Sequence, residues 1–336
     1  MEASQVAARY LRFADVEARG RSPLYEAIAR GVAADREALE FLLMLPPEKQ
    51  QPNLLLAAVR HLFGTPADWI GFRTTLLANR DAVAALMQSR STQTNEPARC
   101  ATLLPLLLLL QQQQQQLQQP LALIEVGASA GLCLLPDHYG YDYGRARLPG
   151  EPMFRCAVNA ATPIPRALPQ IVWRAGLDLN PIDLSDAGEV AWLETLVWPE
   201  QTERLANLRR AVKVAAAIKP RIVQGDLLGD NLARLCDEAP KEATLVIFHT
   251  AALAYVPDLA ARVAFGTRAM RYGTWISNEF PGVFPDIAKR APVPGAPGRF
   301  LLSMNGTPMA WTDPHGAALD WIAAPTNGKN SPDRSE

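Results

Sequence analysis

The chain has 336 residues, a formal net charge of −1 at pH 7, 20% charged residues and 49% hydrophobic residues. At about 150 residues per domain this length predicts two domains, and the composition is typical of a globular protein. The near-neutral charge argues against nucleic acid as a main partner, because such a partner requires a basic surface.

The most apolar segment, residues 103–110, is interrupted by Pro105. It is much shorter than the roughly 18 apolar residues of a membrane span, so we expect a buried helix and no membrane partner. The four cysteines are widely spaced, with no Cys-x-x-Cys pair and no histidine at metal-ligand spacing. We therefore expect reduced thiols, no metal site and, without a signal-peptide pattern at the N-terminus, a cytoplasmic protein.

Residues 1–119 carry apolar residues at helical spacing and no convincing strand, which predicts an all-helical N-terminal domain. The glutamine run that ends this region is expected to extend its last helix to Pro120. The polar segment 90–99 is interpreted either as a loop between helices or as the rim of a site. Its candidate site residues are Gln93, Asn95, Glu96 and Arg99.

The apolar run 121–124 predicts a short buried strand that ends on Glu125. A turn of small residues follows at 127–131, and residues 132–135 continue as an apolar helix start. Glycine and alanine let a ligand approach the backbone, and the N–H groups of a first helical turn can hold its polar atoms.

Three interpretations of this turn remain open. It can bind a nucleotide or S-adenosylmethionine, with Glu125 at the strand end. It can be the Gly-x-Ser-x-Gly nucleophile elbow of a hydrolase, which Gly127, Ser129 and Gly131 spell. It can also be a tight turn without a ligand, because short glycine motifs have low specificity.

Four further strands are predicted after this turn. They cover residues 171–178, 221–226, 244–249 and 273–279. Helices lie between them, and this alternation predicts a Rossmann-like, doubly wound, mostly parallel sheet with ligands at the carboxyl ends of its strands. Asp178 ends the second strand, where a ribose hydroxyl pair is usually held, although it follows the glycines by far more than the usual ~20 residues.

The segment 136–169 is expected to be a long irregular insertion, whose tyrosines either line a lid or anchor the loop. They are Tyr139, Tyr141 and Tyr143. Residues 280–298 also look irregular. Asn305-Gly306 predicts a C-terminal antiparallel hairpin. We thus expect a helical domain at 1–119, the α/β core at 120–325 and a disordered polar tail at 326–336.

The core resembles the class I S-adenosylmethionine-dependent methyltransferases over roughly residues 120–312. Residues 125–131, Glu-Val-Gly-Ala-Ser-Ala-Gly, look like the first motif of that family, and Gly225-Asp226-Leu227 looks like the third. Asp178 matches the acid that implies ribose binding, residues 246–251 match the segment beside the methyl group, and the closing hairpin resembles the family's last two strands.

The resemblance implies S-adenosyl-L-methionine as the cofactor. The residues implied to bind it are Glu125, Gly127, Ala128, Ser129, Gly131, Asp178, Asp226, Leu227, His249 and Thr250. The chain departs from the family in Ala128 and Ser129, in its long insertion, and in lacking the Asn/Asp-Pro-Pro-Tyr motif of amino-methylating enzymes.

The chain is also similar to an uncharacterised family that combines a helical N-terminal domain with such a core. The similar residues are the glycine segment 125–132, residues 93–96 and the Trp-Pro pair at 198–199. That resemblance implies no substrate.

Methyl transfer requires alignment of the sulfonium with a nucleophile and a site that can remove a proton. His249 is the best candidate base, because it ends the most apolar strand and imidazole titrates near neutral pH. A hydrogen-bonded core histidine or a cofactor contact is the alternative for His249. Tyr255 and Glu279 are further catalytic candidates.

The expected activity is therefore methyl transfer to an unknown acceptor, most simply a small molecule. One alternative is a non-catalytic scaffold or sensor that binds a nucleotide ligand. Another is a serine hydrolase with Ser129 as nucleophile, Asp226 as acid and His249 or His315 as base.

Overall fold

The computed structural model describes residues 2–113 and 119–322. The chain divides into two compact units. The helical unit comprises Met1–Thr94 and Ile182–Arg209, and the sheet unit comprises Asn95–Pro181 and Arg210–Glu336. The expected boundary after residue 119 differs from this division, because residues 95–119 cluster with the sheet and residues 182–209 cluster with the N-terminal helices.

The helical unit confirms the helical N-terminal region. Its elements are α1 (Ala3–Arg12), the π-helical turn η1 (Phe13–Ala18), α2 (Pro23–Ala34), α3 (Arg36–Leu43), the 3-10 turn η2 (Pro47–Lys49), α4 (Pro52–Phe63), α5 (Trp69–Ala78), α6 (Arg80–Ser89) and α8 (Ala187–Thr195). Their apolar faces share one core, in which Tyr10, Phe41, Phe72 and Trp192 are buried. No strand occurs among the described residues of this unit.

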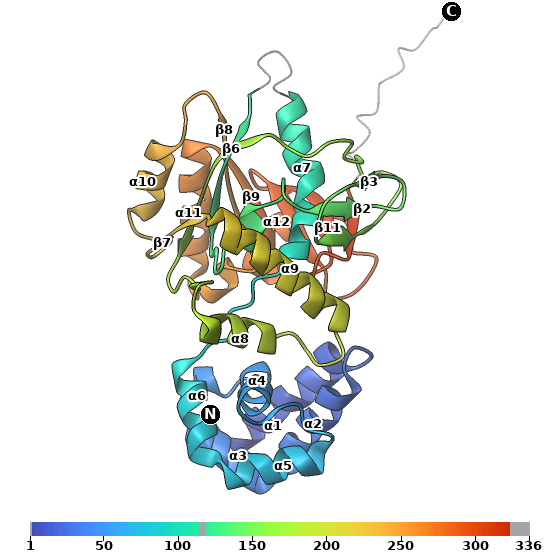
Figure 1. Cartoon of the computed structure of the whole chain (residues 1–336), viewed down its shortest axis with the longest axis vertical. Helices are drawn as coiled ribbons and strands as arrows, with labels where there is room; N and C mark the ends of the chain where they lie inside the picture. The colour runs from blue at the N-terminus through green and yellow to red at the C-terminus, as the bar shows by residue number, and fades with distance from the viewer. Residues whose placement is uncertain (1, 114–118, 323–336) are drawn as a thin grey trace, which may run out of the picture. The chain divides into compact units, whose positions relative to one another are not determined.

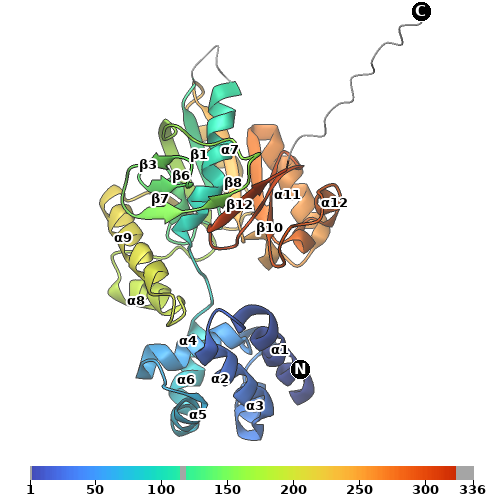
Figure 2. The ribbon, with the colours of Figure 1, turned by 90° about the vertical axis from the view of Figure 1, so that its right-hand side faces the viewer.

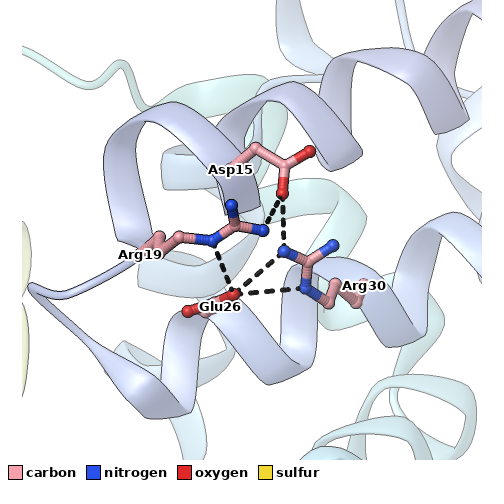
Figure 3. A network of polar contacts seen from close by, with 4 residues as sticks. All are labelled: Asp15, Arg19, Glu26 and Arg30. Atoms are coloured by element: carbon pink, nitrogen blue, oxygen red, sulfur yellow. Dashed lines mark hydrogen bonds and ion pairs between the residues drawn. The ribbon is translucent and has the colours of Figure 1, made fainter.

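Four charged side chains connect η1 to α2 (Figure 3). Arg30 lies 2.6 Å from Asp15 and 2.9 Å from Glu26, and Arg19 lies 2.5 Å from Asp15. The hydrogen bond from Arg30 lowers the pKa of both carboxyl groups. These side chains are largely solvent-exposed, so they orient η1 on α2 and contribute little to stability.

The sheet unit is built on a nine-stranded mixed sheet in the order β5-β12-β11-β10-β9-β8-β1-β6-β7. Its strands are β1 (Leu121–Val126), β5 (Ala157–Val158), β6 (Ile171–Asp178), β7 (Arg221–Gln224), β8 (Thr244–Thr250), β9 (Thr274–Glu279), β10 (Phe300–Met304), β11 (Thr307–Thr312) and β12 (Ala318–Trp321). The helices and turns outside the helical unit are η3 (Pro97–Arg99), α7 (Cys100–Gln113), η4 (Leu132–Leu134), α9 (Thr202–Ile218), α10 (Asn231–Glu238), η5 (Leu253–Tyr255), α11 (Leu259–Tyr272), η6 (Pro281–Val283) and α12 (Pro285–Ala288). Of these, α9 spans the division between the units.

The strand β1 lies at the centre of five parallel strands. It pairs with β6 on one side and β8 on the other, and β7 and β9 extend the sheet outward. All six residues of β1 are buried, which explains the apolar run at 121–124. The chain therefore moves outward through β6 and β7 before it crosses back to β8 and β9.

One face of the sheet packs against α10 and α11, which lie beside each other in Figure 1. Ile124 and Val126 of β1 share a core with Leu235 of α10 and Phe265 of α11. Because alternate residues of a strand point to opposite faces, Glu125 points to the other face. Figure 2 shows the same sheet unit from the side.

The insertion that was expected to be irregular contains a second sheet, in the order β3-β2-β4. Its strands are β2 (Gly140–Asp142), β3 (Arg147–Leu148) and β4 (Met153–Arg155). The three tyrosines are buried anchors: the hydroxyls of Tyr139, Tyr141 and Tyr143 donate to backbone carbonyls at 2.8, 2.6 and 2.8 Å. Hence they are not free to form a lid.

The hairpin of β10 and β11 confirms the Asn-Gly signal, since Asn305 and Gly306 both have positive φ angles of 48° and 75°. The segment 280–298, expected to be irregular, contains η6 and α12. The continuation of α7 through residues 114–118 and the expected disordered tail lie outside the described residues. All four cysteines are free and buried.

Within residues 2–113 and 119–322, none of the helices combines the length and the apolar character that crossing a membrane requires.

We predict that Ser22→Ala destabilises the helical unit by about 1 kcal/mol, because Ser22 caps α2. Its hydroxyl accepts from the Tyr25 N–H at 3.1 Å and donates to Glu200 at 2.9 Å. Urea unfolding measures the loss. Ser89→Ala, at the exposed end of α6, is the control; equal stability of the two variants would contradict the cap assignment.

Candidate functional site

The candidate site lies where the parallel strands end. Val126, Asp178, Thr250 and Glu279 are the last residues of β1, β6, β8 and β9. The carboxyl ends of neighbouring parallel strands meet at one edge of a sheet, so these positions are brought together by the topology. The carboxyl ends of these strands therefore lie side by side in the sheet unit, as the sequence predicts.

The glycine turn, residues 127–131, docks on the end of β6. The N–H groups of Gly127 and Ala128 donate to the Leu177 carbonyl at 2.8 and 3.3 Å. Gly127, Ser129 and Gly131 have left-handed backbones, with φ angles of 73°, 53° and 72°. A serine rarely adopts this conformation, so its neighbours must hold it there.

Asp178 holds the turn in this conformation. Its Oδ2 accepts from the Ser129 N–H and its Oδ1 accepts from the Asn180 N–H, both at 2.8 Å. Asp178 therefore lies beside the glycines despite the long insertion.

The helix expected after the turn is absent from the described structure. Residues 132–134 form only the 3-10 turn η4. Asn95 satisfies its first N–H, because Asn95 Oδ1 accepts from Leu132 N at 2.8 Å, and the Cys133 thiol donates to the Glu96 carbonyl at 3.2 Å. The site-rim interpretation of the polar segment therefore fits Asn95 and Glu96, whereas Gln93 belongs to the helical unit.

Small residues let the turn pack against its neighbours. A Cβ added to Gly127 would lie 2.4 Å from the Ala252 Cβ, and one added to Gly176 would lie 2.6 Å from the Ala128 Cβ. The space beside Gly127 is therefore filled by the loop after β8. We infer that Gly127 is required for protein packing as well as for its φ angle.

His249 is a buried core histidine. It is fully buried, and its Nδ1 lies 2.7 Å from Glu279 Oε1. The Trp275 indole N–H donates to His249 Nε2 at 3.0 Å, so Nε2 must be unprotonated and Nδ1 carries the proton. Because both ring nitrogens are engaged, the geometry does not support His249 as a catalytic base. It supports the alternative, in which His249 is a hydrogen-bonded core histidine.

Glu279 positions the loop that follows β8. Besides His249, its Oε1 accepts from the N–H groups of Ala252 and Leu253 at 2.8 and 3.0 Å. Its other oxygen, Oε2, is buried and has no partner among the described residues. Ser277 and Ser303 line a small cavity with Glu279. Glu279 therefore connects His249 to the loop that packs on Gly127.

The remaining sequence candidates lie further out. Asp226 follows the end of β7, is exposed, and accepts from the Leu228 N–H at 2.8 Å in a turn; Leu227 beside it is half-buried. Gly225, which precedes Asp226, contacts the site, because its N–H donates to the Asp178 carbonyl at 2.8 Å. Tyr255 lies in η5 and is 71% exposed, so it is not enclosed in a site.

Glu125, Thr250 and Asn278 share the sheet face opposite to His249 and Glu279. The register pairs Thr250 with Asn278 and Glu125 with Phe248, and alternate residues share a face. Glu125 is buried and its Oε2 has no partner in the described ranges. Burial, and then the neighbouring Cys133 thiol, raise the pKa of Glu125 well above its usual range, although Arg99 acts in the opposite direction.

Arg99 spans the end of β8 on this face. Its Nη1 donates to the Thr250 carbonyl and hydroxyl at 3.2 and 3.3 Å, and its Nε donates to the Pro314 carbonyl at 2.8 Å. Beside it, Asn278 Oδ1 accepts from the Thr312 hydroxyl at 2.7 Å. Asn278 is not among the site residues predicted from the sequence, although alternation along β9 places it on the face opposite to Glu279.

The hydrolase triad is not assembled. Ser129 Oγ is buried and has no hydrogen-bond partner in the part of the chain described, so no described histidine lies within hydrogen-bond distance of it. His249 uses both nitrogens elsewhere, and Asp226 lies in its own exposed turn. The described residues also contain no group of three or more His, Cys, Asp or Glu side chains that could hold a metal ion.

We predict that Gly127→Ala is more destabilising than Gly144→Ala by about 1–3 kcal/mol, the usual cost of overpacking. Both glycines have positive φ angles, 73° and 71°, but a Cβ at Gly144 would meet nothing within 4 Å. Denaturant unfolding of the two variants separates packing from backbone strain. Equal losses would show that Ala252 does not confine the turn.

We predict that Glu125→Gln becomes increasingly favourable relative to the wild type as the pH rises. The raised pKa means that folded Glu125 keeps a proton that the unfolded chain loses above about pH 4.3. The wild type therefore loses about 1.4 kcal/mol per pH unit from there up to the folded pKa. Urea unfolding of both proteins at pH 5 and pH 8 measures this; a difference that is independent of pH would contradict it.

Comparison with protein families places the chain among bacterial proteins. A family model described as "Uncharacterized protein conserved in bacteria (DUF2332)" matches residues 7–321. No curated protein matches the chain.

Proposed function

This chain belongs to the DUF2332 family of bacterial proteins, and we propose that it binds S-adenosylmethionine at the carboxyl ends of β1 and β6 and transfers its methyl group to a small-molecule acceptor. The strand order β7-β6-β1-β8-β9 supports a Rossmann-like, doubly wound core, with β1 at the point where the strand order reverses. Ligands of such sheets bind in the crevice at that point.

The observation that carries the proposal is the contact between Asp178 and the glycine turn. An acid at the end of the second parallel strand lies directly on the Gly-rich turn that follows the first, through the Ser129 N–H at 2.8 Å. The same arrangement suits a ligand with vicinal hydroxyls, because a carboxylate at this position accepts hydrogen bonds from hydroxyl groups. The insertion between the two strands does not separate them in space.

The residues present fit a polar nucleoside ligand on the side of the turn that Ala252 does not fill. Ser129 Oγ and Glu125 Oε2 are both buried without a hydrogen-bond partner among the residues that the structure describes. Buried polar atoms normally have partners, so such groups at a turn are explained by an absent ligand or water. Glu125 and Ser129 would then bind the polar groups of the cofactor.

When bound, S-adenosylmethionine supplies an electrophilic methyl group on a sulfonium. The protein's contribution is to align the acceptor and to exclude water. Glu279 holds residues 252–253 against Gly127, and Arg99 fixes Thr250 at the end of β8. These contacts position the loop beside which the resemblance places the methyl group.

His249 cannot serve as the base in this arrangement, because both of its nitrogens are engaged on the opposite sheet face. The proposal therefore favours acceptors that need no strong general base, such as a thiolate, a carboxylate or an unprotonated amine. It disfavours alcohols, whose protons require one.

A non-catalytic ligand-binding role is the second candidate. It is favoured by the engagement of His249 and Glu279 with each other, which leaves no base on the methyl-transfer face among the described candidates. Both roles require the nucleoside site, so only a methyl-transfer assay with a bound acceptor distinguishes them.

We predict that S-adenosylhomocysteine binds the purified protein and that Asp178→Ala weakens its binding at least tenfold, which corresponds to about 1.4 kcal/mol. Calorimetric titration measures both affinities. Asp142→Ala is the matched control, since Asp142 Oδ1 accepts from the Gly144 N–H at 2.9 Å, in the smaller sheet. Absence of binding to folded wild-type protein would contradict the cofactor assignment.

A further inference from the structure

Arg99 is a buried cation whose charge has no counter-ion in the described residues. Its exposed fraction is only 5%. Two of its nitrogens donate to neutral oxygens of Thr250 and Pro314, and its guanidinium lies 6.0 Å from the centre of the Phe300 ring. Buried charges in proteins are normally paired, because desolvation of an isolated charge is costly.

Arg174 shows the usual arrangement in the same unit. Its two Nη atoms lie 2.8 and 2.7 Å from the two oxygens of Asp137. Arg99 has no such carboxylate, and its Nη2 donates no hydrogen bond within the ranges 2–113 and 119–322. The difference between the two arginines indicates that the charge of Arg99 can pair with an anion outside the described protein atoms.

A second donor without a partner lies on the other side of Thr250. Asn278 pairs with Thr250 in the register of β8 and β9, and Ala251 N donates to the Asn278 carbonyl at 3.1 Å. Its side chain is fully buried; Oδ1 accepts from Thr312, and Nδ2 has no partner among the described atoms. Arg99 and Asn278 therefore flank the same strand end with one unused donor group each.

Glu125 forms no direct ion pair with Arg99 in the described residues. It lies on the same face, one strand away, and forms no ion pair or hydrogen bond through Oε2 with the described residues. Burial raises its pKa, although Arg99 acts in the opposite direction.

We propose that Arg99 and Asn278 form a binding subsite for the carboxylate of a small-molecule ligand at the end of β8. One uncompensated positive charge matches one negative charge, and two donor groups match the two oxygens of a carboxylate. A phosphate, with up to two negative charges and three free oxygens, would exceed what this subsite offers. The carboxylate belongs either to the methyl acceptor or to the amino-acid part of the cofactor.

Acetate and its neutral isostere acetamide test the subsite without requiring any nucleoside. Thermal unfolding is measured over a concentration series of each, with chloride replaced to keep ionic strength constant. We expect acetate to raise the Tm of the wild type with saturation, because a ligand of the folded state stabilises it, and acetamide to leave the Tm unchanged. Equal effects of acetate and acetamide on the wild type would overturn the proposal.

Asn278→Asp tests the charge requirement directly. It supplies an internal carboxylate beside Arg99, so we expect a higher Tm than the wild type without ligand and no response to acetate. Ser277→Asp is the matched control, because it places the same charge one residue away on the face of Glu279; we expect a lower Tm and a retained acetate response. A lower Tm for Asn278→Asp, as for any buried unpaired carboxylate, would overturn the proposal.

Binding of two nucleosides decides whether the cofactor or the methyl acceptor supplies the carboxylate. S-adenosylhomocysteine carries a carboxylate and 5′-methylthioadenosine does not. If the cofactor supplies it, Arg99→Met weakens S-adenosylhomocysteine at least tenfold and leaves 5′-methylthioadenosine unchanged. If the acceptor supplies it, both affinities are unchanged and acetate still stabilises the protein saturated with S-adenosylhomocysteine. Failure of both nucleosides to bind contradicts the proposed cofactor and leaves the acetate result to decide the subsite.

Discussion

The candidate site depends on one hydrogen bond between backbone and side chain, from the Ser129 N–H to Asp178. Ser129 has a φ angle of 53°, a conformation that a residue with a side chain adopts only when its surroundings compensate for it. Asp178 and the carbonyl of Leu177 hold the turn against β6. On the far side of the turn, Asn95 satisfies the first N–H of η4, so a short 3-10 turn replaces a helix.

The central sheet separates two groups of polar residues that are adjacent in the sequence. His249, Trp275 and Glu279 form one continuous hydrogen-bonded chain on the α11 face, and this chain ends on the amides of residues 252–253. Glu125 and Asn278 lie on the opposite face with unused polar atoms. The first group supports the loop and leaves one oxygen, Glu279 Oε2, without a partner among the described residues. The second leaves Glu125 Oε2 and Asn278 Nδ2 without one.

The sequence predicts the fold better than the site. Alternating strands and helices after residue 120 and the Asn305-Gly306 turn are local signals, and the structure contains them. The role of His249 depends on Trp275 and Glu279, which are 26 and 30 residues away, so no local pattern reveals that both of its nitrogens are occupied. The missing helix after Gly131 has a similar cause: an apolar run at 132–135 suits a helix and a buried 3-10 turn equally well, and the decision comes from Asn95, 37 residues earlier.

Hydrogen exchange with and without S-adenosylhomocysteine tests the central claim most directly, because it reports where the ligand acts rather than only whether it binds. The account predicts slower amide exchange in peptides that cover residues 125–133 and 176–180 when the ligand is added, with α1–α3 of the helical unit unchanged. Unaltered exchange in both segments at a saturating ligand concentration would contradict the assignment of the cofactor site to the glycine turn and Asp178.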